Sequence, residues 1–282
     1  MAIYDCFQYF NEDHIVDLRL NILNNQVDFF VISESTRNHQ GQIKKLNFNK
    51  NNFKKFKNKI IYLVADPEEN LLEKKHKFGH SLIEQHQRNY VSKGLSKADS
   101  EDLILVSDSD EIPNLKKLSK IKKKYFAFSQ KAFCYKINLL NLAENNWIGT
   151  RGCKFKHLSS PQKLRFKKFK NYPFWRIDKI NHQIINDGGW HFSYLMDPEK
   201  ISEKIKSFSH GEDNIEENTE IVNIKKKLIN FSHPTKNYKL EKIEIDSTFP
   251  DYIFENTIKL KKWIEKYFIF FFSNIFFPIL SF

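Results

Sequence analysis

The sequence contains few cysteines and no segment typical of secretion at its start. Its 282 residues include three cysteines, and their odd number and spacing match neither a disulfide framework nor a metal knuckle. Such usage is typical of a reducing compartment. The first residues lack a basic stretch followed by an apolar one, so we expect neither a signal peptide nor an N-terminal membrane anchor. No internal repeat is visible.

Acidic residues are outnumbered by basic ones. Lysine and arginine total 46 against 34 aspartate and glutamate residues, which gives a net charge of +12 and a pI near 9.3. This balance suits an anionic partner: a nucleotide, a polyanionic glycan, an acidic membrane surface or nucleic acid. A solvated lysine-rich surface explains the same excess, because much of it lies within residues 44–59, 116–124 and 163–170.

The apolar content is sufficient for one large α/β domain, alone or with a subdomain. Hydrophobic residues make up 40% of the chain and aromatic residues 15%. Apolar runs predict strands at residues 3–7, 27–33, 60–64 and 103–106, with helices from residue 13 and over residues 70–93. Strands that alternate with helices favour a mixed, mostly parallel sheet flanked by helices, which is a Rossmann-like architecture.

The second half of the chain has a less regular pattern. It predicts a helix over residues 114–123, two strands within 125–142, a turn-rich segment at 147–155, a loop leading into a strand at 188–195, and a helix that begins at Pro198.

An acidic loop follows the apolar run at residues 103–106. Asp108, Asp110 and Glu111 lie within four residues, and Pro113 prevents a simple continuation of the strand. In an open α/β sheet, ligands bind at the carboxyl ends of the strands. Carboxylates this close together repel one another unless a cation lies among them, and oxygen ligands suit Mg²⁺ or Mn²⁺. A second interpretation is that these residues only cap the next helix.

The C-terminal residues form a different kind of segment. We divide the chain into a domain over residues 1–230 and a helical extension over 231–282, with a helix at 252–266. Residues 267–282 are almost entirely apolar and contain seven phenylalanines. As a helix they would span about 24 Å, less than the roughly 30 Å of a hydrocarbon core. The tail therefore predicts either peripheral membrane contact or packing on the core or on a second protomer.

Several blocks of the sequence resemble glycosyltransferase family 17, which contains beta-1,4-N-acetylglucosaminyltransferases. They follow the family's order over roughly residues 1–215, and they are Tyr4-Asp-Cys-Phe7 with Asn11-Glu12, Asp17-Leu-Arg-Leu-Asn21, Val27 to Ser35, Gln87-Arg-Asn89 with Gly94-Leu95, Ser107 to Pro113, and Gly188 to Ser193. The residues after this region resemble no relative.

The resemblance implies a GT-A-like fold, a UDP-sugar donor such as UDP-GlcNAc, and sugar transfer with inversion, here expected to form a beta-1,4 linkage. Eukaryotic members of the family are Golgi enzymes with an N-terminal anchor and stem, and neither is visible here. We therefore expect a cytoplasmic enzyme, peripheral at the inner face of a membrane if the tail binds it. Its acceptor would be an oligosaccharide or a lipid-linked saccharide.

With this resemblance, the acidic loop becomes the expected metal site. Asp110 is the first candidate ligand of Mn²⁺ or Mg²⁺, and Asp108 would contact the metal or the ribose. His191 follows Gly188-Gly189-Trp190 and is a candidate metal or diphosphate ligand, with His210 as a rival. Glu111 is expected to orient the loop or to contact the donor sugar.

Other strand-end and basic residues are candidates for donor binding. Arg88 and Arg151 could form planar, bidentate contacts with a diphosphate. Asp5, Glu34 and Ser35 end strands on the presumed ligand side, where the fold suggests uracil or ribose recognition. Arg19, on the first helix, is expected to pair with a carboxylate.

Inverting transfer requires a general base that deprotonates the acceptor hydroxyl. Asp187, just before Gly188, is one candidate, with Glu212 and Asp213 as rivals.

Two other functions fit parts of the sequence. A nucleotidyl- or phosphotransferase would use the same acidic loop and would turn over a nucleotide without sugar transfer. A basic nucleic-acid-binding module would explain the net charge, but lysine is dispersed and we expect no nucleic-acid partner.

Overall fold

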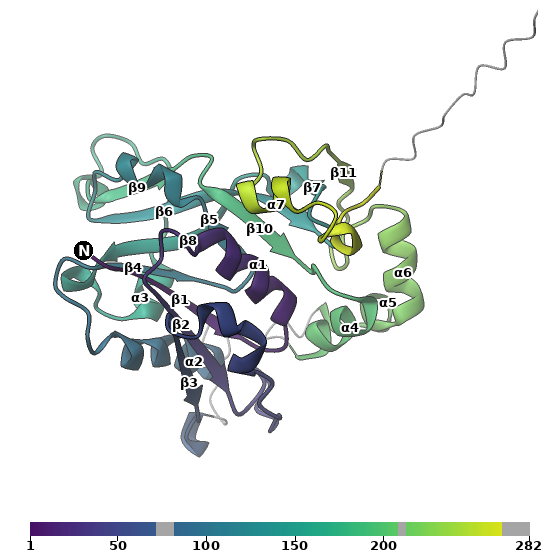
Figure 1. The fold of residues 1–282 in the computed structure, drawn as a ribbon, viewed down its shortest axis with the longest axis horizontal. Helices are drawn as coiled ribbons and strands as arrows, with labels where there is room; N and C mark the ends of the chain where they lie inside the picture. Colours follow the sequence, from purple (N-terminus) through teal and green to yellow (C-terminus); the bar gives the residue numbers. More distant parts are fainter. Residues whose placement is uncertain (72–81, 208–212, 267–282) are drawn as a thin grey trace, which may run out of the picture.

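The structure is a computed structural model that describes residues 1–71, 82–207 and 213–266. Its described part is built on one mixed sheet of eleven strands, with helices packed on both faces (Figure 1). This confirms the expected α/β class. The main path of the sheet has the strand order β11-β7-β6-β8-β4-β1-β2-β3.

The first half of the chain forms the parallel part of the sheet. Strand β1 lies between β2 and β4 and is parallel to both, and β3 continues the sheet beyond β2. Helix α1 leads from β1 to β2, and α2 with a 3₁₀ turn precedes β4. The bounds are β1 Ile3–Tyr9, α1 Asp13–Leu23, β2 Phe29–Ser35, β3 Ile60–Ala65, α2 Leu82–Tyr90, the 3₁₀ turn Val91–Leu95, and β4 Leu103–Ser107.

Alternate side chains of the parallel strands enter two different cores. Ile3 and Phe7 of β1 pack with apolar residues of α1, whereas Tyr4 and Cys6 pack with the turn after α2 and with α3. This period of two is what a strand covered on both faces requires. It also explains why β4 reads as a continuous apolar run.

The second half of the chain extends the sheet with strands of both directions. Strand β8 is antiparallel to β4 and to β6, and β10 runs between β5 and β6. The bounds are β5 Glu111–Pro113, β6 Tyr125–Cys134, β7 Leu139–Asn141, β8 Trp147–Lys154, α3 Pro161–Phe166, β9 His182–Ile185 and β10 Gly189–Ser193. The expected pair of strands within 125–142 is confirmed.

Two predictions in this half were wrong. Residues 147–155 form strand β8, because their glycines serve close packing: a Cβ on Gly149 would lie 1.8 Å from Gln130 Oε1, and one on Gly152 would lie 2.2 Å from Phe126 Cζ. The helix expected over 114–123 is the 3₁₀ segment Leu115–Lys120. Leu115 is its one buried residue, so an apolar face that could support a longer α-helix is missing.

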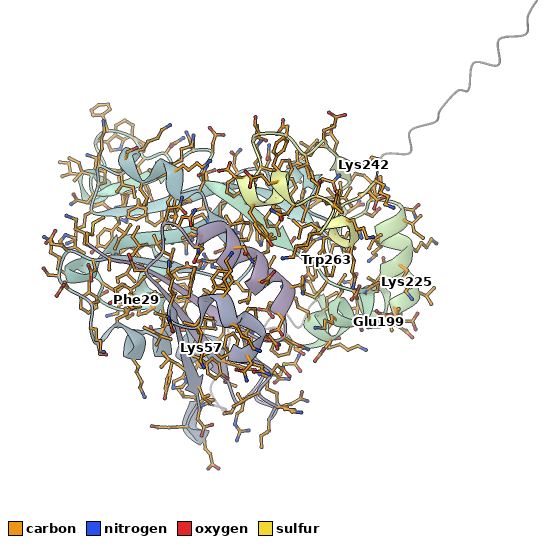
Figure 2. All side chains as sticks on the ribbon, viewed as in Figure 1. Phe29, Lys57, Glu199, Lys225, Lys242 and Trp263 are labelled. Carbon is orange, nitrogen blue, oxygen red and sulfur yellow. The ribbon has the colours of Figure 1, made fainter. Side chains whose placement is uncertain are left out.

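The helix predicted over residues 70–93 is only partly described. Helix α2 and its 3₁₀ turn cover residues 82–95, and residues 72–81 lie outside the described part of the chain. The helix predicted from Pro198 is confirmed as α4, which packs with two shorter helices at one end of the molecule (Figure 1). Their bounds are α4 Pro198–Ser207, α5 Glu216–Thr219 and α6 Ile221–Ile229. Glu199 Oε1 of α4 lies 3.6 Å from Lys225 Nζ of α6, and both residues are labelled in Figure 2.

The described part of the C-terminal extension is integrated into the domain. Strand β11, Leu240–Lys242, pairs with β7, and Phe249, Ile253 and Leu260 belong to the main core. The predicted helix over 252–266 is reduced to α7, Asp251–Glu255, and the 3₁₀ turn Lys261–Trp263. Ile258 between them is 85% exposed, so this stretch has no continuous apolar face.

The predicted membrane contact of residues 267–282 lies outside the described residues. Within the part of the chain that the structure does describe, no helix has the length and apolar character needed to cross a bilayer.

Candidate active site

The acidic loop lies where the order of the parallel strands reverses. From β1 the chain first builds β2 and β3 on one side and then returns to place β4 on the other side. In open α/β sheets, the carboxyl ends of the two strands at such a reversal, here β1 and β4, border the crevice where ligands bind. Asp108, Ser109 and Asp110 connect β4 directly to β5 at this position.

A buried arginine binds the main chain of the acidic loop. Arg19 of α1 is completely buried and donates hydrogen bonds to the main-chain carbonyls of Asp108, Ser109 and Glu111, at 3.2, 3.2 and 2.7 Å. The same guanidinium forms an ion pair with Asp5, as expected for Arg19 from the sequence. The loop conformation is thus fixed by a cation that does not reach the crevice.

Asp108 is clamped between two arginines. Arg88 of α2 contacts its Oδ1 at 3.1 Å, and Arg165 of α3 contacts its Oδ2 at 2.8 Å. Burial disfavours the charged carboxylate, but Arg165 and Arg88 outweigh burial and hold the pKa of Asp108 well below its usual range. Asp108 is therefore ionised and positions both guanidinium groups beside the acidic loop.

Glu111 orients its neighbours, as expected. It is completely buried, accepts hydrogen bonds from Arg165 at 2.7 and 2.8 Å, and accepts another from Trp147 Nε1 at 2.7 Å. Its Oε2 also accepts from the main-chain N–H of Asp108 at 3.1 Å. Glu111 thereby fixes Arg165 and the Trp147 ring on one side of the acidic loop.

Asp110 faces a different group of side chains. Its Oδ1 lies 3.6 Å from His191 Nε2, and its Oδ2 lies 3.3 Å from Lys204 Nζ. The His191 ring stacks on Trp147, with centroids 4.7 Å apart. Burial lowers the pKa of Lys204, but Asp110 and Glu12 overcome this and raise it, so the ammonium group stays charged.

Glu12 is a further buried carboxyl beside the loop. It accepts hydrogen bonds from Ser109 Oγ and from the main-chain N–H of Asn11, both at 2.7 Å. Burial raises its pKa, opposed chiefly by Lys204. Its oxygens are therefore engaged within the protein, and its role is to support the loop.

Several buried polar atoms around this network lack a hydrogen-bond partner in the described structure. They are Arg88 Nε, Gln130 Oε1, Arg151 Nε, Gln162 Nε2 and His191 Nδ1. Burial lowers the pKa of Arg151 to about 10, and Arg165 contributes to this shift. Buried polar groups are normally satisfied, so a cluster of unsatisfied polar atoms is what a polar ligand or bound water would complete.

The residues fit a divalent cation that binds together with an anionic ligand. Two neighbouring ligands of an octahedral ion lie about 3 Å apart, close to the 3.6 Å between Asp110 Oδ1 and His191 Nε2. Among the described residues, no group of three or more His, Cys, Asp or Glu side chains could hold a metal ion. The geometry therefore suits two protein ligands completed by phosphate oxygens or water, and not a preformed cage.

Three candidates for donor binding form hydrogen bonds with other residues of the protein and are buried. Asp5 is buried and gives both oxygens to Arg19. Glu34 is buried and accepts from Lys44 Nζ, from two main-chain N–H groups and from the Tyr62 hydroxyl. Ser35 is also buried and accepts from a main-chain N–H. Burial and internal hydrogen bonds make all three structural, which corrects the expectation that they contact the uracil or ribose.

Asp187, one of the candidate bases, is not brought together with the loop. Asp187 is exposed and precedes β10 at the end opposite to the acidic loop, because Gly188 bonds to Asn114 whereas Phe192 bonds to Asp110. This register separates Asp187 from Asp110 by on the order of 15 Å. Asp187 therefore cannot serve a reaction at the loop, which corrects that expectation.

The remaining candidates are distributed differently. Glu212 and His210 lie outside the described residues. Asp213 Oδ1 lies 3.7 Å from Lys236 Nζ.

Arg165 and Lys204 are the site residues that sequence reasoning missed. Arg165 lies within residues 163–170, which were interpreted as a lysine-rich surface, and Lys204 is one lysine among many. A signal for Arg165 did exist, because the chain has only six arginines. Four of them, Arg19, Arg88, Arg151 and Arg165, lie in or directly below this site. Arginine is the side chain suited to planar, bidentate contacts.

The fold and the site together define an α/β protein with an acidic loop and a cluster of basic side chains at the ligand crevice of a Rossmann-like sheet. The model of glycosyltransferase family 17 matches residues 1–231. The chain therefore belongs to glycosyltransferase family 17 and is a glycosyltransferase, which confirms the resemblance seen in the sequence.

Other comparisons add little. A comparison with curated proteins gives no match. Among solved structures, the chain is similar to the inositol-1-phosphate CTP transferase from T. maritima, with 10% identity and a TM-score of 0.30 over 94% of this chain and 98% of that one. A TM-score this low supports no conclusion about the fold or the substrate.

Proposed function

We propose that the chain is a metal-dependent, inverting glycosyltransferase that moves GlcNAc from UDP-GlcNAc to a saccharide hydroxyl with a beta-1,4 linkage. Membership of the family supports the transferase activity. The observation that supports the donor class is the pairing of Asp110 and His191 at the strand crossover, with charged Arg88, Arg165 and Lys204 next to the same loop. Such a surface suits a diphosphate, which carries negative charge and planar groups of oxygen acceptors.

In this proposal the basic side chains hold the diphosphate. Arg165 donates to Asp108, Glu111 and the Gly149 carbonyl. Arg88 donates to Asp108, Glu84 and Gln162. Both guanidinium groups are therefore held in place before the donor arrives, and their positive charge faces it. Arg88 Nε and Arg151 Nε are buried without partners and can donate to phosphate oxygens. Fixed donors need no rearrangement as negative charge develops on the leaving group, and this is how such sites stabilise a transition state.

Asp110 and His191 would hold the Mn²⁺ or Mg²⁺ ion, with phosphate oxygens as further ligands. The Trp147 ring, anchored by Glu111, keeps the His191 ring directed toward Asp110. A divalent cation at this position neutralises charge on the departing UDP. Lys204 supplies a second positive charge on the other oxygen of Asp110.

The acceptor in this proposal is an oligosaccharide or a lipid-linked saccharide that enters beside residues after about position 130. Glu212 remains the candidate base, since it follows the end of α4, the helix that carries Lys204, by five residues. We also propose a cytoplasmic location. The free, buried Cys6, Cys134 and Cys153 support it, because they suit a reducing compartment.

The experiment is a panel of UDP-, GDP- and CMP-sugars tested for hydrolysis and transfer with Mn²⁺, with Mg²⁺ and with EDTA. We expect slow, metal-dependent release of UDP from one sugar, lost in Asp110→Asn. Asp251→Asn is the matched control, because Asp251 is an exposed carboxylate paired with Lys116 away from the loop. Nucleotide turnover without sugar transfer would instead indicate a nucleotidyl- or phosphotransferase. Absence of nucleotide-sugar binding by folded protein would reject the proposal.

A further inference from the structure

Residues 166–182 form an exposed surface that is both aromatic and basic. We call it the 166–182 surface. It leads from α3 into β9, at the left of the molecule in Figure 1. Four large apolar side chains project into solvent: Phe174 is 95% exposed, Ile177 76%, Trp175 65% and Ile180 59%. Several large apolar side chains close together on a solvent-exposed surface mark an interaction site.

Basic side chains surround these apolar groups. The 166–182 surface itself carries Lys167, Lys168, Lys170, Arg176 and Lys179, against the single carboxylate of Asp178. A second lysine cluster lies alongside, because Gln183 bonds to the main chain of Lys120 and Lys122. This segment adds the exposed Lys120, Lys122, Lys123 and Lys124.

A cavity of about 430 Å³ hollows the same surface. Its lining combines the apolar side chains of Phe169, Phe174 and Ile180 with the basic side chains of Arg176 and Lys179. The surface thus offers a recess and not only projecting groups.

We infer that the 166–182 surface docks the enzyme on an anionic membrane. Tryptophan and other aromatic rings favour the interfacial region of a bilayer, and lysine clusters are attracted to anionic headgroups. Ile177 and Ile180 distinguish this partner from single-stranded nucleic acid, because aliphatic side chains bury in acyl chains but do not stack on bases. The surface is separate from residues 267–282, on which sequence reasoning placed membrane contact.

The 166–182 surface is joined directly to the active site. Arg165, which holds Asp108 and Glu111, immediately precedes Phe166. The Arg151 guanidinium carbon Cζ lies 6.0 Å from the centroid of the Phe169 ring. Phe169 also lines the cavity. Docking by this surface would hold the enzyme at the membrane, where a lipid-linked saccharide lies. The docking itself does not depend on the proposed reaction.

The first test is cosedimentation of the full chain with vesicles of phosphatidylcholine, alone or with about 30% phosphatidylglycerol. We expect binding to the anionic vesicles that weakens with salt, and about ten-fold weaker partition for Phe174→Ser/Trp175→Ser. The control is Val222→Ser/Ile258→Ser, which removes apolar groups that are 74% and 85% exposed elsewhere. Equal binding of both double variants, or no binding by wild type, would overturn the inference.

The second test reports on the surface even if residues 267–282 also bind lipid. The three native cysteines are buried, so Ile177→Cys can be labelled selectively with a polarity-sensitive dye. Val222→Cys is the matched control, since the two positions are 76% and 74% exposed. We expect anionic vesicles to shift the emission of the dye at position 177 to the blue and leave position 222 unchanged. A shift with a single-stranded oligonucleotide but not with vesicles would assign the surface to nucleic acid and overturn the inference.

Discussion

Arg19 and Asp5 form a bidentate ion pair, with Nη2–Oδ1 and Nε–Oδ2 distances of 2.6 and 2.7 Å and no solvent exposure of either side chain. The pair joins α1 to β1, and the remaining N–H groups of Arg19 hold the acidic loop. Buried charges are costly unless they are fully paired. The core of the domain and the conformation of its acidic loop therefore depend on the same guanidinium.

Replacement of Arg19 should destabilise the protein strongly. Arg19→Met leaves Asp5 buried without its partner, so we expect the free energy of unfolding to fall by about 3–5 kcal/mol. Urea denaturation followed by circular dichroism measures this change. Arg176→Met is the matched control, because the Arg176–Asp178 pair is exposed and should contribute much less. Equal losses in the two variants would show that the buried pair has no special role.

Replacement of Arg165 should affect catalysis more than the fold. Arg165→Lys keeps the positive charge but loses the planar fork that reaches Asp108 and Glu111 together. We expect kcat/KM to fall about 100-fold, while the urea midpoint changes far less. Lys163→Ala, on the exposed face of the same helix, should behave as wild type. Full activity in Arg165→Lys would remove Arg165 from the proposed donor site.

The low pKa of Asp108 makes a directional prediction about stability and pH. Because the folded-state pKa lies below the unfolded value of about 3.9, the unfolded chain takes up the proton first as pH falls. The stabilisation from Asp108 is therefore fully present above that value and is lost as pH drops below it. We expect wild type to lose more stability than Asp108→Asn between about pH 5 and about pH 3 in urea titrations. Parallel curves for the two proteins would contradict the assignment, and Asp251→Asn provides an exposed-carboxylate control.

Sequence reasoning located the acidic loop because its signals are local. An apolar run that ends in Asp108 and Asp110 predicts a buried strand with a polar end, and the structure places both at the crossover of the sheet. The same rule failed for Asp5 and Glu34. They also end or interrupt strands, but side chains distant in sequence cover them, and strand patterns do not show which ends stay open.

The rest of the site depends on contacts between distant segments. Arg165 reaches Asp108 across 57 positions, and Lys204 reaches Asp110 across 94. The strand register separates Asp187 from the loop, because the pairing of β10 with β5 places Asp187 beyond the end of β10 that is farther from Asp110. Neither periodicity nor spacing in a single sequence contains these pairings.

The metal and the donor nucleotide should bind cooperatively. Asp110 and His191 offer only two ligands, so we expect Mn²⁺ alone to bind weakly and UDP to tighten it at least about ten-fold by adding phosphate oxygens. The electron paramagnetic resonance signal of free Mn²⁺, titrated with and without UDP, measures this without any turnover. Asp110→Asn and His191→Ala should each abolish the effect of UDP, while Asp251→Asn should retain it. If UDP bound equally well in EDTA, Arg88, Arg165 and Lys204 would suffice to neutralise the diphosphate, and the chain would be a metal-independent transferase.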